Sequence, residues 1–277
     1  MRNVLSSKLA QFTYAQIIDG LPIEDVAWDQ RIPAVYGNHP IEHHPELCPG
    51  ALEFALEYKD KLDFELLSFP RELTTKYVQS TPDSKVFNTR LIELVAMALN
   101  LIGILLFDVG IEVHQGTGGR SIEAITHWKQ DPDDETLPTM FHHPYHLHGD
   151  IYPLGVSNLV GYWAEDRILG GVNLAQPPNV YIITSRAGTT PRYWQLLDSQ
   201  QEGLVDFFLK EDDAGKGPLL LMCTEENKVR IDERFAVVPR GVYRDVWQRL
   251  PPSEKHMRHM DRRPRREGDY PRMERWI

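Results

Sequence analysis

Leu91 to Phe107 reads LIELVAMALNLIGILLF and is the most apolar stretch of the 277-residue chain. Its 17 residues are at the short limit for a membrane span and include Glu93 and Asn100, so we expect a buried helix instead. Apolar side chains surround this helix on nearly every side, which is typical of a central core helix. A Pro-Asp-Ser run at 82–84 predicts where the helix begins.

The elements on the two sides of this helix differ in kind. Before it, apolar residues recur at helical spacing over 3–19, and further helices are predicted after Pro49 and Pro70. After it, a helix is expected at about 193–210. Short apolar runs bounded by glycine and proline predict four strands, at 158–163, 167–174, 179–185 and 219–223. Helices first and strands second predict an α+β fold, with the helical half packed on a mainly antiparallel sheet.

We expect a single domain over residues 1–250, with its helical part at 1–130 and its sheet part at 138–240. A last helix is predicted near 242–250. Residues 251–277 form a basic tail, because eight Lys or Arg and five Asp or Glu follow from position 254 on. The rest of the chain is acidic, so the tail is expected to dock on its own domain.

Charge and cysteine content narrow the class of protein. The formal net charge of −10 argues against a nucleic-acid binder, which normally presents a basic face. Two cysteines, Cys48 and Cys223, cannot form a disulfide framework, and no secretory signal is visible at the start of the chain. We therefore expect a cytoplasmic protein that binds a small molecule and no membrane.

The densest group of titratable side chains lies between 142 and 153. Imidazole is the usual general base near neutral pH, and residues two apart point to the same side of an extended chain. His146, His148 and Asp150 follow this spacing. We expect Asp150 to act as the acid or base, His148 as its partner, and Tyr152 as a hydrogen-bond donor to a developing oxyanion.

The stretch 160–172 is interpreted as strand, turn and strand, with Glu165 and Asp166 at the corner of a hairpin. Asp and Arg favour such a corner for structural reasons alone. The functional alternative places Glu165 beside Asp150, where paired carboxylates have different pKa values and supply an acid and a base. On that hypothesis Glu165 is catalytic and Trp163 shapes the substrate pocket.

Arg90, Glu93 and Asn100 fall on one face of the central helix. A buried carboxylate must be paired or protonated, because an isolated buried charge costs several kcal/mol. Arg90 is the simplest partner for Glu93. The alternative is a polar stripe in which these three residues, with His146, line a substrate pocket.

Cys48 precedes a predicted helix start and follows His44 by four positions. We expect an ordinary cysteine there. The alternative is a thiolate activated by the neighbouring histidines, His43 and His44.

Four short runs resemble a block found in uncharacterised proteins of filamentous fungi. They are DIYP at 150–153, VGYWAE at 160–165, ILGGV at 168–172 and YWQLLD at 193–198. The resemblance covers about a third of the chain and implies a lineage without a known activity. Genes of this kind often lie among specialised-metabolite pathways, which is an association and not a mechanism.

Together these patterns favour a small-molecule enzyme of specialised metabolism that transfers protons, as in isomerisation, cyclisation or dehydration, without an organic cofactor or a metal. One alternative is a non-haem iron/2-oxoglutarate oxygenase, because His148-Gly149-Asp150 matches the H-x-D half of the facial triad. Its iron would be held by His148 and Asp150 together with a distal histidine in the tail, His256 or His259. His146, His148 and Asp150 are the alternative set of metal ligands. A non-catalytic binding protein is the other alternative.

Overall fold

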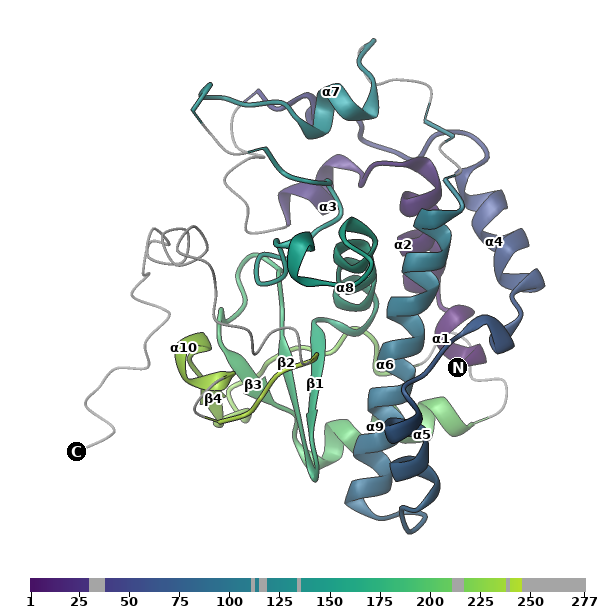
Figure 1. The fold of residues 1–277 in the computed structure, drawn as a ribbon, viewed down its shortest axis with the longest axis vertical. Coiled ribbons are helices and arrows are strands. Elements are labelled where there is room, and N and C mark those ends of the chain that lie inside the picture. Colours follow the sequence, from purple (N-terminus) through teal and green to yellow (C-terminus); the bar gives the residue numbers. More distant parts are fainter. Residues whose placement is uncertain are drawn as a thin grey trace.

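The structure is a computed structural model that describes residues 1–29, 38–110, 113–114, 119–133, 136–210, 217–237 and 240–245. Helices fill its N-terminal half, and four antiparallel strands form a sheet in its C-terminal half, so the predicted α+β class is confirmed (Figure 1). The α-helices are α1 (Arg2–Leu5), α2 (Lys8–Asp19), α3 (Glu24–Trp28), α4 (Ala51–Lys61), α5 (Arg71–Val78), α6 (Lys85–Asp108), α7 (Ile122–Thr126), α8 (Val156–Leu169), α9 (Asp198–Leu209) and α10 (Glu233–Ala236). The 3-10 helices are η2 (Pro40–His43), η3 (Phe64–Leu66) and η4 (Gly149–Ile151), and the strands are β1 (Val172–Gln176), β2 (Asn179–Ile183), β3 (Tyr193–Gln195) and β4 (Arg230–Ile231).

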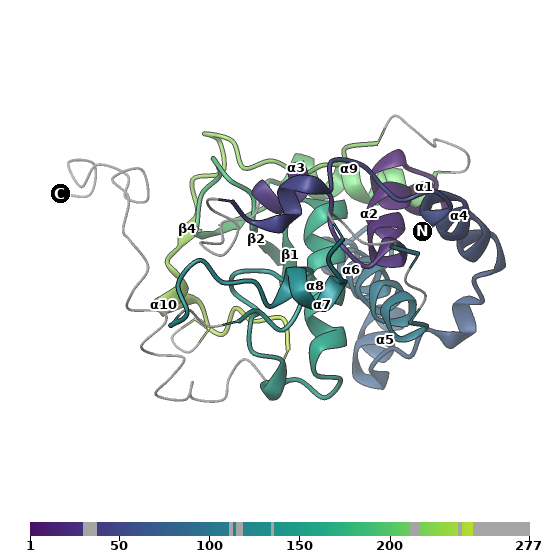
Figure 2. The ribbon, with the colours of Figure 1, turned by 90° about the horizontal axis from the view of Figure 1, so that it is seen from above.

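Helix α8 lies between the sheet and the pair α2 and α6 in both views (Figures 1 and 2). Helix α4 packs along α2 on the side away from the sheet. The elements therefore follow one another in the order sheet, α8, then α2 and α6, then α4, and α6 also contacts β1 and β2 directly beside α8.

Serine caps explain where the N-terminal helices begin. The Ser84 hydroxyl accepts the backbone N–H of Phe87 at 3.1 Å, so α6 begins as predicted. The Ser7 hydroxyl accepts the N–H of Ala10 at 3.2 Å, which starts α2 and divides the helix predicted over 3–19 into two. The helices predicted after Pro49 and Pro70 are α4 and α5.

The strand predicted at 158–163 is wrong because its residues form α8. Of the strand predicted at 167–174, residues 167–169 end α8 and residues 172–174 belong to β1. Positions 159–169 are buried on every side of this helix, so no polar face marks its helical period. The hairpin with Glu165 and Asp166 at its corner is therefore wrong as well. The strand predicted at 219–223 has no regular secondary structure, and the first part of the helix predicted from 193 is the strand β3.

The sheet has the order β1-β2-β3-β4 with antiparallel neighbours. Asn173 lies opposite Ile182, and Ile182 lies opposite Trp194, so these three side chains share one face. Gly170 ends α8 at φ +100° and turns the chain into β1. A Cβ atom at this glycine would lie 2.2 Å from the carbonyl oxygen of Leu221, so only glycine fits the turn.

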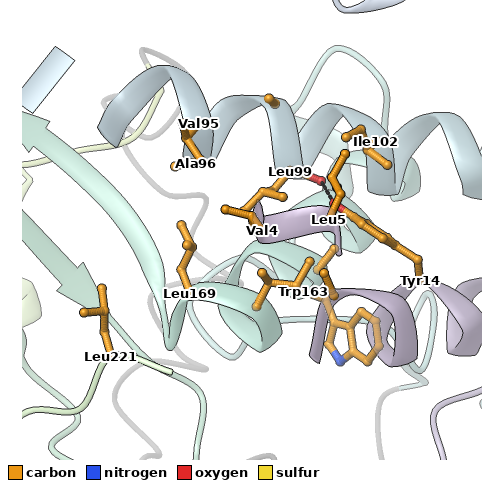
Figure 3. Close-up of a cluster of buried hydrophobic side chains, with 14 of the residues drawn as sticks. Val4, Leu5, Tyr14, Val95, Ala96, Leu99, Ile102, Trp163, Leu169 and Leu221 are labelled. Atoms are coloured by element: carbon orange, nitrogen blue, oxygen red, sulfur yellow. Dashed lines mark hydrogen bonds between the residues drawn. The ribbon is translucent and has the colours of Figure 1, made fainter. Parts of the chain in front are cut away.

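The largest buried cluster draws residues from both halves of the chain (Figure 3). Trp163 of α8 is fully buried in it, and the Tyr14 hydroxyl donates to the carbonyl oxygen of Leu99 at 3.1 Å. Helices α6 and α8 approach closely because small residues meet where they cross: a Cβ atom at Gly103 would lie 2.9 Å from the Cβ of Ala164.

Helix α6 is long and apolar enough to cross a membrane, as judged by length and composition within the described residues. A core helix passes the same test, and α6 lies inside the hydrophobic cluster here. The predicted helix at 242–250 is not present over 242–245, and its remainder, like the tail at 251–277 with His256 and His259, lies outside the described residues.

Candidate metal centre

The predicted catalytic residues Asp150 and His148 lie at the surface end of their segment. Asp150 is exposed in η4, and His148, the residue directly before η4, is half-buried. Glu165 is fully buried in α8, with its carboxylate bonded elsewhere. The structure therefore does not pair Asp150 with Glu165.

His146 and Tyr152 are brought together in the interior. Nδ1 of His146 lies 2.9 Å from the Tyr152 hydroxyl, and its ring stacks on Tyr162 with 4.0 Å between centroids. The Tyr162 hydroxyl in turn donates to Asp245. Burial lowers the pKa of His146 well below its ordinary value, and the neighbouring His143 and Arg244 act in the same direction, so the imidazole is neutral at pH 7.

Glu165 is held by two partners that approach different carboxylate oxygens. The backbone N–H of Asn173 donates to Oε1 at 2.7 Å, and Nη2 of Arg244 lies 3.3 Å from Oε2. Burial raises the pKa of Glu165 to about 7, although the charge of Arg244 acts in the opposite direction. Glu165 is thus a buried acidic side chain that titrates near neutral pH.

The residues predicted to bind substrate serve other contacts. Arg90 and Glu93 form an ion pair of 2.6 Å on α6, as the structural interpretation predicted. Asn100 is buried against Gly161, where a Cβ atom would lie 2.6 Å from the Asn100 side-chain oxygen. Trp163 belongs to the hydrophobic core. These side chains do not form one polar pocket with Asp150.

His146, His148 and Asp150 do not form a metal-ligand group among the described residues. The group that does occur there consists of Asp19, His44, Cys48 and His114, with all four ligand atoms within 4.8 Å of one another. The prediction singled out His44 and Cys48 as neighbours but missed Asp19 and His114. The four-residue spacing from His44 to Cys48 was the available signal, whereas the other two residues join them only through the tertiary fold.

The ligands lie at or beyond the ends of regular elements. Asp19 is the last residue of α2 and His44 directly follows η2, whereas Cys48 lies in the loop before α4 and His114 in the loop after α6. Backbone hydrogen bonds fix these ends: the N–H of His114 donates to the carbonyl oxygen of Asp19 at 3.2 Å, and the N–H of Glu24 donates to that of His44 at 2.8 Å. The donor positions are therefore set by the main chain as well as by side-chain packing.

Three distances between side-chain atoms of this cluster, two of them to different carboxylate oxygens of Asp19, fall in the range found between the ligands of a zinc ion. Nε2 of His44 lies 3.4 Å from Oδ2 of Asp19, Nδ1 of His114 lies 3.4 Å from Oδ1 of Asp19, and Sγ of Cys48 lies 3.4 Å from Nδ1 of His114. Ligands of zinc at its usual bond lengths of 2.0–2.3 Å stand about 3.3–3.7 Å apart along the edges of a tetrahedron.

Two of these polar atoms are buried without a hydrogen-bond partner in the described part of the chain. They are Oδ1 of Asp19 and Nε2 of His44, whose side chains are 0% and 4% exposed. Each lies close to the other donors without the angles of a hydrogen bond. Donor atoms that face a common point, and not one another, are what a bound cation requires.

A Cys-His-Asp catalytic triad explains the same residues less well. In a triad the nucleophile and the carboxylate contact opposite ring nitrogens, so that the imidazole relays a proton between them. Here Sγ of Cys48 and Oδ1 of Asp19 both lie 3.4 Å from Nδ1 of His114. One ring nitrogen cannot serve both partners, so the geometry favours metal binding.

The second carboxylate oxygen of Asp19 has an orienting role. The backbone N–H of Cys48 donates to Oδ2 at 2.8 Å, which leaves Oδ1 for a ligand. Burial alone would raise the pKa of Asp19, but the His44 imidazole and this N–H lower it below its ordinary value. The carboxyl group is therefore ionised at neutral pH, as metal binding requires.

No protein-family model, curated protein or solved structure matches this chain.

Proposed function

We propose that this protein binds one zinc ion through Asp19, His44, Cys48 and His114, and that the ion stabilises its helical half. The observation that carries the proposal is the convergence of four donor atoms within 4.8 Å of one another, with Oδ1 of Asp19 and Nε2 of His44 buried and without a hydrogen-bond partner in the described part of the chain.

The donor set selects the kind of metal. Magnesium and calcium take oxygen ligands almost exclusively, whereas this group offers two imidazoles, one thiol and one carboxylate. Zinc accepts sulfur, nitrogen and oxygen together in tetrahedral geometry. A thiolate and a carboxylate neutralise the charge of Zn²⁺, and a neutral complex suits a buried position.

The position of Asp19 gives an independent argument for a cation. Its carboxylate is fully buried at the C-terminal end of α2, where the helix dipole favours positive charge. Burial and the dipole both oppose an ionised carboxylate there. A divalent ion beside Oδ1 compensates for both costs.

A structural role follows from the number and burial of the ligands. Structural zinc sites are closed by four protein ligands, whereas catalytic sites keep a position for water. All four donors here come from the chain, and the side chains of Asp19, His44 and His114 are 0%, 4% and 1% exposed. The ion would join α2, the segment before α4 and the segment after α6.

Metal analysis of the purified full chain tests this proposal, with two adjacent histidines as a matched pair. We expect one zinc ion per chain, retained in His43→Gln and lost in His44→Gln, because His43 is exposed outside the cluster. Calorimetric titration of the metal-free chain with zinc gives the affinity. Equal zinc binding by the two variants, or no binding by the native chain, would contradict the proposal.

The acid–base enzyme predicted from the sequence is a second candidate. The observation in its favour is Glu165, whose pKa of about 7 suits a general acid or base, in contact with Arg244. Because Glu165 is enclosed, a substrate has to displace Arg244 to reach it. Isotope-edited infrared spectra of the Glu165 carboxyl group during a small-molecule screen test this idea, and an unchanged carboxyl signal throughout would argue against it.

A further inference from the structure

Cys48 differs from the other three proposed ligands in its chemistry. It is the one member of the group whose donor atom undergoes reversible oxidation. Asp19 and His44 are buried, whereas Cys48 and His114 are half-buried residues. Exposed residues, Glu46 and Pro49, lie on both sides of Cys48 in the chain. The sulfur therefore belongs to the less buried part of the cluster.

The surroundings of this sulfur favour reaction once the metal is bound. A ligating cysteine is a thiolate, which is the nucleophilic form. Nδ1 of His114 lies 3.4 Å away, and α4, a helix of 11 residues, begins three positions later with its positive end toward this segment.

We propose that Cys48 is a site of reversible oxidation by hydroperoxides and that its oxidation releases the zinc ion; this inference rests on the zinc site proposed above. The thiolate sulfur attacks one peroxide oxygen, an S–O bond forms and the O–O bond breaks. Sulfur loses two electrons to the peroxide. The oxygen that is not attacked leaves as hydroxide from hydrogen peroxide, or as alkoxide from an organic hydroperoxide, and takes a proton to become water or an alcohol. A thiol reductant reverses the change through a mixed disulfide, with water as the other product.

Oxidation removes one of the four ligands and its negative charge. A protonated sulfenic acid is a poor ligand for zinc, and its added oxygen has to fit where the donors are already 3.4 Å apart. The remaining carboxylate and two imidazoles hold the ion more weakly. The expected consequence is release of the ion and loosening of the contacts around the start of α4.

Cys223 provides an internal control in the same chain. It is also half-buried, but its sulfur lies 3.8 Å from the carbonyl oxygen of Thr224 and belongs to no metal-ligand group in the described ranges. Burial raises the pKa of the Cys223 thiol, which keeps it protonated and less reactive. Peroxide should therefore modify Cys48 before Cys223.

The test adds graded hydrogen peroxide to the zinc-loaded full chain. Released zinc is measured with a chromophoric chelator, and the oxidation state of each cysteine is read by mass spectrometry after trapping of sulfenic acid. We expect one zinc ion released per oxidised Cys48, release in Cys223→Ser within about twofold of the native rate, and rebinding after dithiothreitol and zinc are added. Cys48→His keeps a possible ligand without redox chemistry and should retain zinc in peroxide.

Different outcomes separate this inference from the zinc proposal itself. A chain that holds no zinc before peroxide is added overturns both. Zinc that stays bound after Cys48 is oxidised, or that leaves while Cys48 is still reduced, overturns the redox inference alone. The native-chain ratio of released zinc to oxidised Cys48 decides the matter, even where a Cys48 variant fails to fold.

Discussion

Asp19 makes three contacts that the candidate site depends on. Its Oδ2 accepts the N–H of Cys48, its Oδ1 lies 3.4 Å from Nδ1 of His114, and its backbone carbonyl accepts the N–H of His114. An asparagine has nearly the same shape and keeps an oxygen for Cys48, but it lacks the negative charge. Substitution by asparagine therefore separates packing from metal binding.

We predict that Asp19→Asn weakens zinc binding by at least about 10-fold, since even residues that only orient metal ligands contribute 10–100-fold. Competition with a chromophoric chelator measures the affinity. The control is Asp25→Asn, because Asp25 is exposed on the next helix, α3. Equal zinc affinity for the two variants would show that Asp19 is not a zinc ligand.

Glu165 gives a prediction for the dependence of stability on pH. Its pKa of about 7 in the folded protein lies above the ordinary value of 4.5, so the fold binds a proton that the unfolded chain releases. The stabilisation is complete below about pH 4.5 and is lost as the pH rises through 7, a change of about 3 kcal/mol. Glu165→Gln should abolish this part of the pH dependence. Urea unfolding of both chains from pH 4.5 to 8 checks it, and parallel curves would show that Glu165 does not titrate there.

At the scale of the elements, the crossing of α6 and α8 depends on the absence of side chains. A Cβ atom at Gly161 would lie 2.6 Å from the Asn100 side chain and 2.9 Å from the Asn100 backbone oxygen. We predict that Gly161→Ala destabilises the fold by about 1–3 kcal/mol through overpacking. Gly203 of α9 has no heavy atom within 4 Å of its Cβ position, so Gly203→Ala should stabilise the fold by about 1 kcal/mol. Urea denaturation measures both, and a stable Gly161→Ala chain would mean that the two helices can move apart.

The same two helices show how far the sequence predicts this fold. α6 has a serine cap, and its length and position followed from its apolar run. The sequence of α8 shows no alternation of buried and polar positions at helical spacing, because Trp163, Glu165 and Asp166 are all buried. A helix that is buried on every side cannot be distinguished from strands by its periodicity. Burial of charged side chains in α8 is compensated by partners in distant segments, such as Arg244 and Ser185. Such partners are set by the tertiary fold.

The candidate metal site could likewise be predicted only in part from the sequence. His44 and Cys48 are near in sequence and were recognised as neighbours, although their favoured interpretation was an ordinary cysteine. Asp19 and His114 are separated from them by whole helices, and their pairing depends on how α2 and α6 pack. A single sequence contains no signal for that contact.

For the whole molecule, removal of the metal should loosen one half and leave the other in place. A ligand that binds the folded state at 1,000 times its Kd stabilises it by about 4 kcal/mol. For a chain of this size we therefore predict that excess chelator lowers the Tm by about 10 °C. Scanning calorimetry with zinc and with chelator checks the shift, which should be absent in His44→Gln.

Hydrogen exchange of the backbone amides shows which segments are loosened when zinc is removed. Amides of residues 38–50 and 113–114 should lose protection when zinc is removed, because those segments contain three of the four ligands and little regular structure. The strands β1 and β2 should keep theirs. Uniform loss of protection over the whole chain would indicate global unfolding and no local role for the ion.

The spread of the donors along the chain also sets the order of events during synthesis. The ribosome delivers Asp19, His44 and Cys48 first, but the fourth ligand, His114, emerges only after all 24 residues of α6. A nascent chain therefore displays an incomplete set of ligands until its central core helix is available to fold. Tight capture of the ion has to follow the packing of α2 against α6, so a bound ion reports that this half of the protein has already assembled.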